Sequence, residues 1–477
     1  MAKREFHREE YLQLADVTHK SAIVSWGSFF FRIKDTRGGF KLVDDSDLDR
    51  VHPPRHQTIG ARSEPYGDAV VEARVAGTDE IAAVAMTSAT NWVRLTGLLP
   101  DTEYTYSVVV NGEPWAAGEL LDWVVDGDHG GLAALGGAYD NRFRTHAHPT
   151  ASAPLVFAVL GDFGIGVRKP STPKNQQREI AAALTRAVSD RGVRLILTTG
   201  DNIYAGRKFL GLPIGATGDE DDDWFFTYYQ PYRYILNRVP VYPSVGNHDS
   251  GEVELENDDR SQLMDNFFLK ERFDTPEAAP FASMDPGLFY RVRFGADIEF
   301  VCLDTSKASP IPGDRFFLNP KHRAFLDEAF PPSRPADAPI WQLPFAHHPP
   351  YTAGPRHYNS QSVITHLVSR FQAAGVRVFF AGHEHNFQHS IAEGIHYFVT
   401  GGGGKVSDDP LRSNRFEAAH TTSWAGEGHF LLVDIRGPQM TVLPIGALSA
   451  GGELAPIVLN SPAGPPAPTP IVITASS

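Results

Sequence analysis

The sequence predicts an α/β domain with buried strands, preceded by an all-β sandwich. Residues 1–148 alternate apolar and polar side chains with a period of two, as in 70–75 (VVEARV) and 104–110 (YTYSVVV). After residue 154 the apolar runs become continuous and are interspersed with helical spacing. With 42% hydrophobic and 21% charged residues, the composition is that of an ordinary globular protein. Together these three observations favour two folded domains of different class.

The first domain is expected to be an antiparallel sandwich. Residues 22–26 (AIVSW) read as a strand and end at Trp26, which we expect in the core. The stretch 95–106 (LTGLLPDTEYTY) resembles the corner of fibronectin type III domains. Two long inserts, 29–60 and 118–137, depart from the usual sandwich of about 100 residues.

The domain boundary is predicted in a small, polar segment that contains proline. Residues 145–154 (THAHPTASAP) have the composition of a linker, so we expect a sandwich domain over 1–148 and a second domain over 149–459. The end of the chain, 460–477, is rich in Pro, Ala and Thr and is expected to form a loosely held tail.

The second domain begins with a strand, helix and strand unit. Residues 155–160 (LVFAVL) and 193–199 (VRLILTT) are apolar runs, and 176–190 carries helical spacing. Such a unit predicts an α/β domain whose strands are buried. Helical patterns follow at 224–238, 321–329 and 363–374, and further apolar runs end at Val245, Leu303, Ala346 and Ala381.

Charge, cysteine count and hydropathy restrict the partners. A formal net charge of −14 argues against nucleic acid, although a metal site can still attract small phosphate esters. The single cysteine, Cys302, allows no intramolecular disulfide. No segment is long and apolar enough to span a membrane, and the N-terminus shows no export signal. We therefore expect a soluble chain without a membrane partner, either cytoplasmic or exported with its signal removed, and of undetermined oligomeric state.

Polar motifs follow the apolar runs at five places. In an open α/β sheet the carboxyl ends of the strands line one crevice, so residues distant in sequence meet there. Glycine before the polar residue allows a sharp turn beside a ligand. The motifs are Gly161-Asp162-Phe163-Gly164, Gly200-Asp201-Asn202-Ile203-Tyr204, Gly246-Asn247-His248-Asp249, His347-His348-Pro349 and Gly382-His383-Glu384-His385.

The donors in these motifs predict two metal ions. Oxygen and imidazole donors together suit iron, manganese and zinc better than calcium. Seven side chains exceed what one tetrahedral zinc takes, but they fit two ions that share a bridging carboxylate. The candidate ligands are Asp162, Asp201, Tyr204, Asn247, His347, His383 and His385.

The five motifs in this order resemble the calcineurin-like metallophosphoesterase superfamily. Most members begin with D-x-H, whereas this chain has Gly164 at the third position. The G-D-x-x-Y pattern that ends at Tyr204 resembles the purple acid phosphatases, in which a Tyr replaces that ligand. The resemblance implies a four-layer α/β/β/α sandwich for the second domain and a fibronectin-like domain before it.

The resemblance also implies a role for each ligand. Asp162, Tyr204 and His385 would hold Fe(III), and Asp201 would bridge. The remaining ligands, Asn247, His347 and His383, would hold a divalent ion, which would be Fe, Zn or Mn. A phenolate is a hard anionic donor, so its charge-transfer band should colour the protein.

The implied activity is hydrolysis of phosphate monoesters. A metal-bound water would supply hydroxide near neutral pH or below. His248 would contact the phosphoryl oxygens or assist proton transfer, and His357 would protonate the leaving group or contact phosphate. Arg356 and His348 are assigned to substrate contact, Arg356 as a phosphate clamp where the family pattern has His.

Two alternative functions stay open. A phosphodiesterase or nucleotide pyrophosphatase could use the same metals, and the rim loops 208–223 and 250–259 would decide between these substrates. A cell-surface binding protein with an inactive second domain is a third possibility, which an intact ligand set disfavours. The run 401–405 (GGGGK) lacks the Ser or Thr of a P-loop and is expected to form a backbone turn near the metals.

Overall fold

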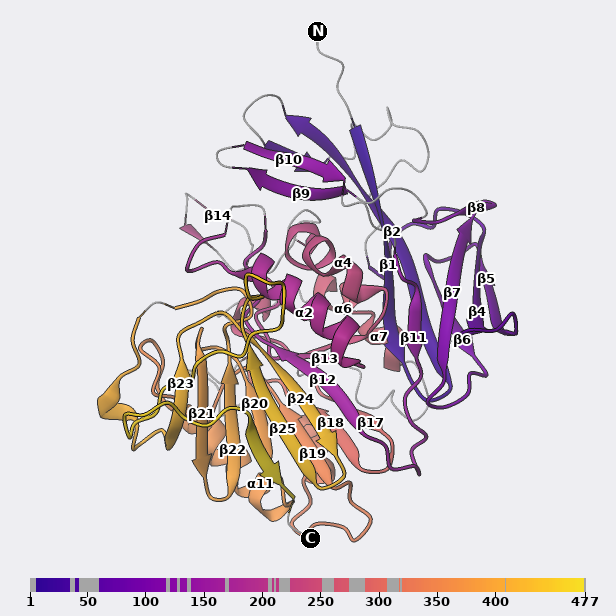
Figure 1. Cartoon of the computed structure of the whole chain (residues 1–477). Coiled ribbons are helices and arrows are strands. Elements are labelled where there is room, and N and C mark those ends of the chain that lie inside the picture. Colours follow the sequence, from indigo (N-terminus) through magenta and orange to yellow (C-terminus); the bar gives the residue numbers. More distant parts are fainter. Residues whose placement is uncertain are drawn as a thin grey trace.

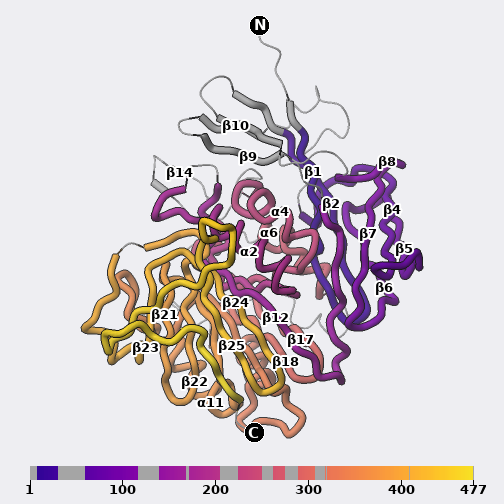
Figure 2. The backbone as a smooth tube through the Cα atoms, in the orientation of Figure 1, coloured from indigo at the N-terminus to yellow at the C-terminus, as the bar shows by residue number. Residues whose placement is uncertain are grey.

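The computed structural model describes most of the chain (Figures 1 and 2). The inserts 29–60 and 118–137 and the rim loops 208–223 and 250–259 fall partly or largely outside the described residues. The described residues are 6–34, 39–42, 60–116, 121–126, 129–134, 139–167, 171–204, 208–209, 212–213, 224–250, 261–273, 288–306, 317, 320–407 and 409–475.

The N-terminal region is a pair of antiparallel sheets. One sheet has the order β1-β2-β3, with β6 also paired to β2, and the other has the order β11-β7-β4-β5, with β8 paired to β7. A separate two-stranded sheet pairs β9 with β10. The strands are β1 Phe6–Val17, β2 Ser21–Lys34, β3 Gly39–Leu42, β4 Ala69–Val75, β5 Ile81–Thr87, β6 Trp92–Thr96, β7 Glu103–Val110, β8 Glu113–Pro114, β9 Leu121–Asp126, β10 His129–Ala134 and β11 Arg142–Arg144.

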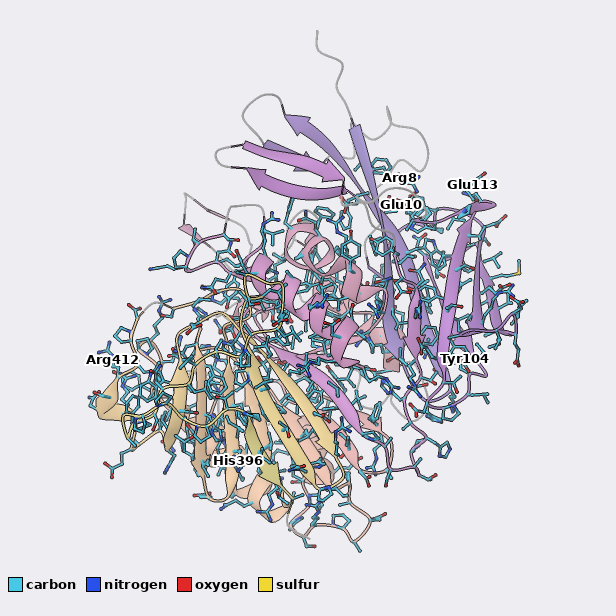
Figure 3. The ribbon with its side chains drawn as sticks, viewed as in Figure 1. Arg8, Glu10, Tyr104, Glu113, His396 and Arg412 are labelled. Carbon is cyan, nitrogen blue, oxygen red and sulfur yellow. The ribbon has the colours of Figure 1, made fainter. Side chains whose placement is uncertain are left out.

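The core of this sandwich follows from the alternating sequence. Strand β7 places every second side chain inside, and Tyr104 on it is fully buried. The Tyr104 hydroxyl accepts the Leu99 backbone N–H at 2.8 Å, which ties the preceding corner to the strand; Figure 3 labels Tyr104. Trp26 is 1% exposed in the same core, so the prediction for Trp26 is confirmed.

The sandwich packs directly on the second domain. Gln13 Nε2 donates to the Asn266 carbonyl at 3.1 Å, and the Tyr106 hydroxyl donates to the Asn237 carbonyl at 2.8 Å. The segment predicted as a linker takes part, because Thr145 and His146 are buried and Arg194 donates to the Thr145 carbonyl. The linker prediction is therefore wrong for these residues: the Thr145 backbone carbonyl accepts a hydrogen bond from the second domain, and the His146 ring packs against Phe294 with centroids 5.1 Å apart.

The second domain contains two large sheets. A six-stranded sheet has the order β16-β13-β12-β24-β25-β26, and a seven-stranded sheet has the order β17-β18-β19-β20-β22-β21-β23. Figure 1 shows the magenta β12 beside the yellow β24, although they are far apart in sequence. The strands are β12 Leu155–Leu160, β13 Ile196–Thr198, β16 Val241–Pro243, β17 Tyr290–Phe294, β18 Ile298–Cys302, β19 Trp341–Phe345, β20 Val378–Ala381, β21 Phe387–Ala392, β22 Ile395–Thr400, β23 Thr421–Ala425, β24 Phe430–Arg436, β25 Gln439–Ile445 and β26 Ile471–Thr474.

Helices cover the outer faces of the two sheets and complete four layers. Phe157 of one sheet meets Phe300 of the other, with ring centroids 5.0 Å apart, so the sheets pack face to face. One hydrophobic core joins both sheets to α2 and α4, and a second lies between the seven-stranded sheet and α9, η3 and α11. The predicted four-layer α/β fold is confirmed. These helices are α2 Gln177–Arg191, η1 Phe225–Tyr229, α4 Gln230–Leu236, α9 Pro320–Ala329, α10 Gln361–Val363, η3 Ile364–Val368 and α11 Ser369–Ala373, and shorter ones are α5 Asn247–Ser250, α6 Ser261–Asn266, α7 Leu269–Phe273 and η4 Ser413–Arg415.

The C-terminal segment is part of this fold. Residues 471–474 form β26, which pairs antiparallel with β25, and Ile473 is 4% exposed. The prediction of a loosely held tail over 460–477 is wrong for this strand, because β-branched residues pair with a sheet edge and bury one face. Among the described helices, none has the length and hydropathy required to cross a membrane.

Candidate metal centre

All five predicted motifs lie at the carboxyl ends of strands, where the two sheets meet. Strands β12, β13 and β16 run parallel and lead to Asp162, Asp201 and Asn247. Strands β19 and β20, also parallel, lead to the histidine motifs at 347 and 383. The sheet order therefore brings together side chains that are up to 223 positions apart, from Asp162 to His385.

Three of the predicted ligands have a strained backbone. Asp162, Asp201 and His383 have φ values of 55°, 50° and 73°, in the left-handed region that non-glycine residues rarely occupy. Such a conformation costs about 1–3 kcal/mol per residue and clusters at functional sites. This backbone conformation lets the chain turn sharply at each of these residues, at the end of a strand.

One half of the site groups a carboxylate, a phenol and an imidazole. The Tyr204 hydroxyl donates to Asp162 Oδ1 at 2.9 Å and lies 3.2 Å from His385 Nε2. His385 Nε2 is 3.5 Å from Asp162 Oδ1. Thus Tyr204 points into the site, as the G-D-x-x-Y pattern predicted.

Gly164 explains why a tyrosine occupies this position. A Cβ at Gly164 would lie 2.2 Å from the Asn202 carbonyl oxygen and 2.3 Å from the Ile203 Cα, so no side chain fits. The close approach lets the Tyr204 backbone N–H donate to the Gly164 carbonyl at 2.9 Å. The loop that excludes a histidine at 164 is therefore the loop that delivers Tyr204.

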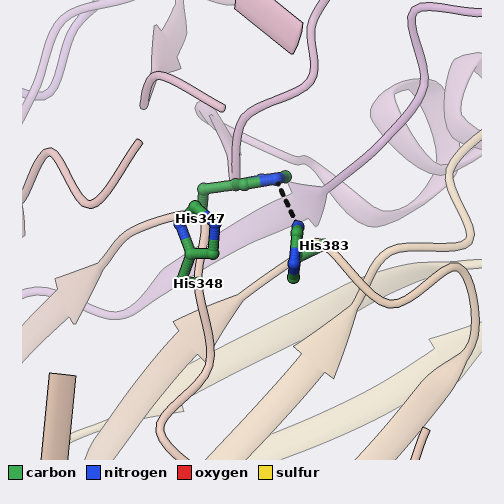
Figure 4. A group of neighbouring side chains, drawn as sticks. All are labelled: His347, His348 and His383. Carbon is green, nitrogen blue, oxygen red and sulfur yellow. Dashed lines mark hydrogen bonds between the residues drawn. The ribbon is translucent and has the colours of Figure 1, made fainter. Parts of the chain in front are cut away.

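The other half of the site groups an amide and two imidazoles. Asn247 Oδ1 lies 2.9 Å from His347 Nε2 and 3.1 Å from His383 Nδ1. Figure 4 shows His347 and His383 pointing toward each other, with 3.1 Å between Nε2 and Nδ1. The His347 Nδ1 faces the Thr199 carbonyl at 2.8 Å, which fixes the ring and leaves Nε2 for a ligand.

Asp201 lies between the two halves. Its Oδ1 is 3.4 Å from His347 Nε2 and accepts the His248 backbone N–H at 2.9 Å. It also groups with Asp162 and His385, with ligand atoms within 4.8 Å of one another. This is the position that a bridging carboxylate requires.

The carboxylates and the phenol are electrostatically coupled. Burial raises the pKa of Asp162 well above its usual value, and the charge of Asp201 adds to the rise. Burial also acts to raise the pKa of Asp201, but the neighbouring His347 and His248 outweigh it and the pKa is lowered. Burial and then the two carboxylates raise the pKa of Tyr204 well above its usual value. These surroundings therefore favour the protonated forms of Asp162 and Tyr204 and the ionised form of Asp201.

Burial favours the neutral form of three histidines at the site. Burial lowers the pKa of His348 and of His385 to about 3, and burial together with neighbouring imidazoles lowers the pKa of His383 well below its usual value. A neutral imidazole has the free lone pair that metal binding requires.

The donor set fits two metal ions. His347, His348 and His383 form one cluster of candidate ligand atoms, and Asp162, Asp201 and His385 form another. Asp162 and Asp201 are 0% and 1% exposed, and a buried carboxylate pair needs nearby positive charge. Adding Tyr204 and Asn247 gives mixed oxygen and nitrogen donors on both sides of Asp201.

Two residues behind the ligands, Asn202 and Asp249, were not predicted to have a role at the site. The Asp249 Oδ2 accepts the Gly246 backbone N–H at 2.7 Å and the Asn202 side-chain amide at 2.9 Å. Asp249 Oδ1 accepts the Ile203 N–H at 3.2 Å, so this carboxylate ties the Asp201 loop to the Asn247 loop. Both residues lie inside the polar motifs, and this position in the sequence could have indicated that they belong to the site.

The run 401–405 forms the turn near the site that was expected. A Cβ at Gly401, Gly402, Gly403 or Gly404 would lie between 2.1 and 2.6 Å from its nearest neighbour, so only glycine allows this packing. The turn carries Lys405, whose backbone N–H donates to the Asp162 carbonyl at 3.0 Å. Its ammonium lies 3.8 Å from the centroid of the Tyr204 ring, a contact that the sequence analysis missed.

The other predicted site residues surround these ligands. The His248 ring lies against Tyr204, with centroids 4.6 Å apart, and the His357 ring lies against His383, with centroids 3.7 Å apart. His348 is 7% exposed, with its Nδ1 3.3 Å from the Thr305 hydroxyl. Arg356 is farther out and exposed, and its guanidinium is 3.4 Å from Asp409.

Comparison with known proteins agrees with this geometry. The calcineurin-like phosphoesterase family matches residues 155–387. Purple acid phosphatase 3 of Arabidopsis thaliana is 24% identical over 273 residues, which are 53% of this chain and 64% of the relative. Purple acid phosphatase 4 of the same plant is 23% identical over 272 residues, 54% of this chain and 70% of the relative. The chain thus spans less than two thirds of the first of these relatives.

Two solved structures share the fold across nearly the whole chain. Purple acid phosphatase PPD1 from yellow lupin has a TM-score of 0.53 and 14% identity, covering 94% of this chain and 74% of its own. PhoD has a TM-score of 0.58 and 12% identity, covering 98% of this chain and 92% of its own. The predicted resemblance to metallophosphoesterases and purple acid phosphatases is confirmed.

Proposed function

We propose that this chain, which carries a calcineurin-like phosphoesterase domain, is a two-metal hydrolase of phosphate monoesters. The observation that carries the proposal is the arrangement of two ligand groups on either side of Asp201, one led by Asp162 and the other by His347. The purple acid phosphatases that the chain resembles support the same reaction class.

The two ligand groups suggest different ions. Asp162, Tyr204 and His385 would hold Fe(III), because hard anionic oxygen donors favour a highly charged ion. The second group, formed by Asn247, His347 and His383, would hold a divalent ion, Fe, Zn or Mn. Asp201 would contact both ions.

Two bound ions would supply a strong nucleophile near neutral pH and positive charge for the phosphoryl oxygens. The protein's own groups then orient the ester. His248, whose ring lies against Tyr204, would contact a phosphoryl oxygen, and His357, whose ring lies against His383, would act beside the second ligand group. Burial lowers the pKa of His357 to about 4, so above that pH it acts as a neutral N–H donor.

Two further side chains would contact the substrate. Arg356 reaches the exposed edge of the site and could clamp a phosphate, since its present partner Asp409 is a surface carboxylate. His348 is fixed by Thr305 through Nδ1, which leaves its other ring nitrogen for the substrate or for the second ion.

Metal analysis and paired assays test the proposal. Protein purified without chelator should contain two ions per chain, one of them iron, and should show a visible absorption band. Its kcat/KM should be higher for an aryl phosphate monoester than for the matching diester. A preference for the diester would replace the monoester assignment by a phosphodiesterase, and fewer than two ions at saturating metal would overturn the two-metal site.

A further inference from the structure

The loop that carries His357 is held by two residues of one distant segment, Arg412 and Arg415. Arg415 Nη1 donates to the Gly354 carbonyl and to the His357 carbonyl, each at 2.8 Å. The Arg412 backbone N–H donates to the Ala353 carbonyl at 3.0 Å, and Figure 3 labels Arg412 near the edge of the domain. These contacts hold the loop from its outer side.

Glu384 holds the same loop from the inner side. Its Oε1 accepts the His357 backbone N–H at 2.6 Å, a short bond to a charged acceptor. Glu384 is 1% exposed and stands between the two predicted ligands His383 and His385. Glu384 thus connects the ligand segment to the loop that carries His357.

The absence of a side chain at Gly354 leaves space for this carboxylate. A Cβ at Gly354 would lie 2.0 Å from the Glu384 Cδ and 2.3 Å from each of its oxygens. The glycine has no positive φ that would otherwise require it. The absence of a side chain at 354 therefore serves the close approach of Glu384.

Burying this carboxylate is unfavourable for folding. An isolated buried charge costs free energy unless it is hydrogen-bonded, and the Glu384 carboxylate finds a partner in the His357 backbone N–H. Its contacts point to the position of His357, whose ring centroid is 3.7 Å from that of His383.

We propose that Glu384 is a positioning residue that fixes His357 so that its ring N–H meets the leaving oxygen of the substrate. This inference rests on the proposed hydrolysis and deepens it by naming the substrate class. A hydrogen bond to the leaving oxygen matters most when that oxygen accumulates charge, as in esters of aliphatic alcohols. The site is therefore built for alkyl phosphates more than for activated aryl phosphates.

A leaving-group series tests the proposal. The substrates are phosphate monoesters that range from nitrophenol to an aliphatic alcohol, and the variants are Glu384→Ala, His357→Ala and the double variant. Each single variant should lower kcat for the alkyl ester by roughly 10- to 100-fold and for the nitrophenyl ester by less, as for groups that orient a catalytic residue. The double variant should lose no more than His357→Ala alone, because both act through one ring.

Two further variants keep the test independent of folding. Glu384→Gln should recover most of the loss, because its amide oxygen still accepts the His357 N–H. Gly354→Ala should reproduce Glu384→Ala, since its Cβ displaces the carboxylate, whereas Gly451→Ala, with only a distant Ser449 contact at 3.7 Å, should match the wild type. Metal content measured for each variant shows whether the ligands stay in place.

Several results would overturn the positioning role. One such result is a double variant whose loss of kcat is the product of the two single losses. Another is an equal loss of kcat for every leaving group. A third is a Glu384→Ala variant with unchanged kcat when His357→Ala is impaired. Failure of the proposed function looks different: the wild-type chain itself would hold no metal pair or cleave no phosphate ester.

Discussion

The two halves of the metal centre have the same number of donors but a different charge. The half with Asp162 and Tyr204 contains groups that must lose protons to bind an ion, and burial raises the pKa of both. In the other half, an amide oxygen and two imidazoles contact one another directly, and this half contains neither a carboxylate nor a phenol of its own. The asymmetry in donor type is therefore present in the protein before an ion binds.

The halves also differ in how the chain supports them. In the first half, the Tyr204 ring contacts Lys405 of the glycine turn, and the loop that carries Tyr204 packs against Gly164. The second half is held by direct contacts around Asn247 Oδ1 and by the Thr199 carbonyl behind His347. Removing one donor should consequently affect one ion more than the other, with Asp201 as the exception.

The largest effect is expected at Asp201, because it serves both halves. Asp201→Asn should lower kcat/KM by more than about 100-fold, beyond the usual cost of losing a residue that only supports a ligand. Metal analysis should show both sites weakened. Asp337→Asn, an exposed carboxylate elsewhere, is the matched control and should keep full metal content. Loss of only one ion in Asp201→Asn would show that the carboxylate is not shared.

Replacement of the phenol should affect only the first half. Tyr204→Phe should abolish the visible band and lower activity by roughly 10- to 100-fold, while the divalent ion is retained. Because the pKa of Tyr204 is raised well above its usual value, the phenol is protonated at neutral pH, and ligation must release that proton. Affinity for the first ion should therefore rise with pH.

Calorimetry in two buffers with different ionisation enthalpies measures that proton. The wild-type chain should release about one proton more than Tyr204→Phe when the first ion binds. Equal proton release by the two proteins, together with an unchanged visible band, would show that Tyr204 is not a ligand.

The reciprocal change affects the second half. Asn247→Ala removes the oxygen that both His347 and His383 contact, so the divalent ion should bind about 10-fold or more weakly. The visible band should remain, since the phenol is untouched. Titration of the divalent ion into the iron-loaded protein measures the affinity. If the band disappears together with the divalent ion, the halves are not independent.

The smallest effect is expected at Lys405. Lys405→Met removes a cation 3.8 Å from the Tyr204 ring centroid, a contact typically worth about 0.5–2 kcal/mol. The ammonium stabilises electrons on the phenol, so its loss should shift the visible band to longer wavelength and change activity only a few-fold. Lys174→Met, an exposed lysine, provides the spectral control. An unshifted band would mean that the cation does not influence the ligand.

Much of the site could be predicted from residue order. Polar residues after buried strands marked Asp162, Asp201 and the histidines at 347, 383 and 385, because strand ends in an α/β sheet share one edge. The pair of Gly164 and Tyr204 indicated where one ligand had been exchanged for another, and the structure shows the steric reason. Burial of Trp26 followed from the alternating pattern around it.

Other features depend on contacts between distant segments. Residues 471–474 form a strand only because the edge of β25 is available to pair with them. The segment 145–154 has linker composition, yet its first residues are buried between two domains. Local composition does not encode either partner, since both pairings join parts of the chain that are not neighbours in sequence.

The sequence by itself determined the kinds of donors and the order in which strands deliver them, because apolar periodicity and glycine turns are local properties. Only the tertiary structure decided that Lys405 faces Tyr204 and that Glu384 holds the loop of His357. Both contacts depend on the distance between loops that different strands place at one edge. That distance is set by the packing of the two sheets, which no short segment specifies.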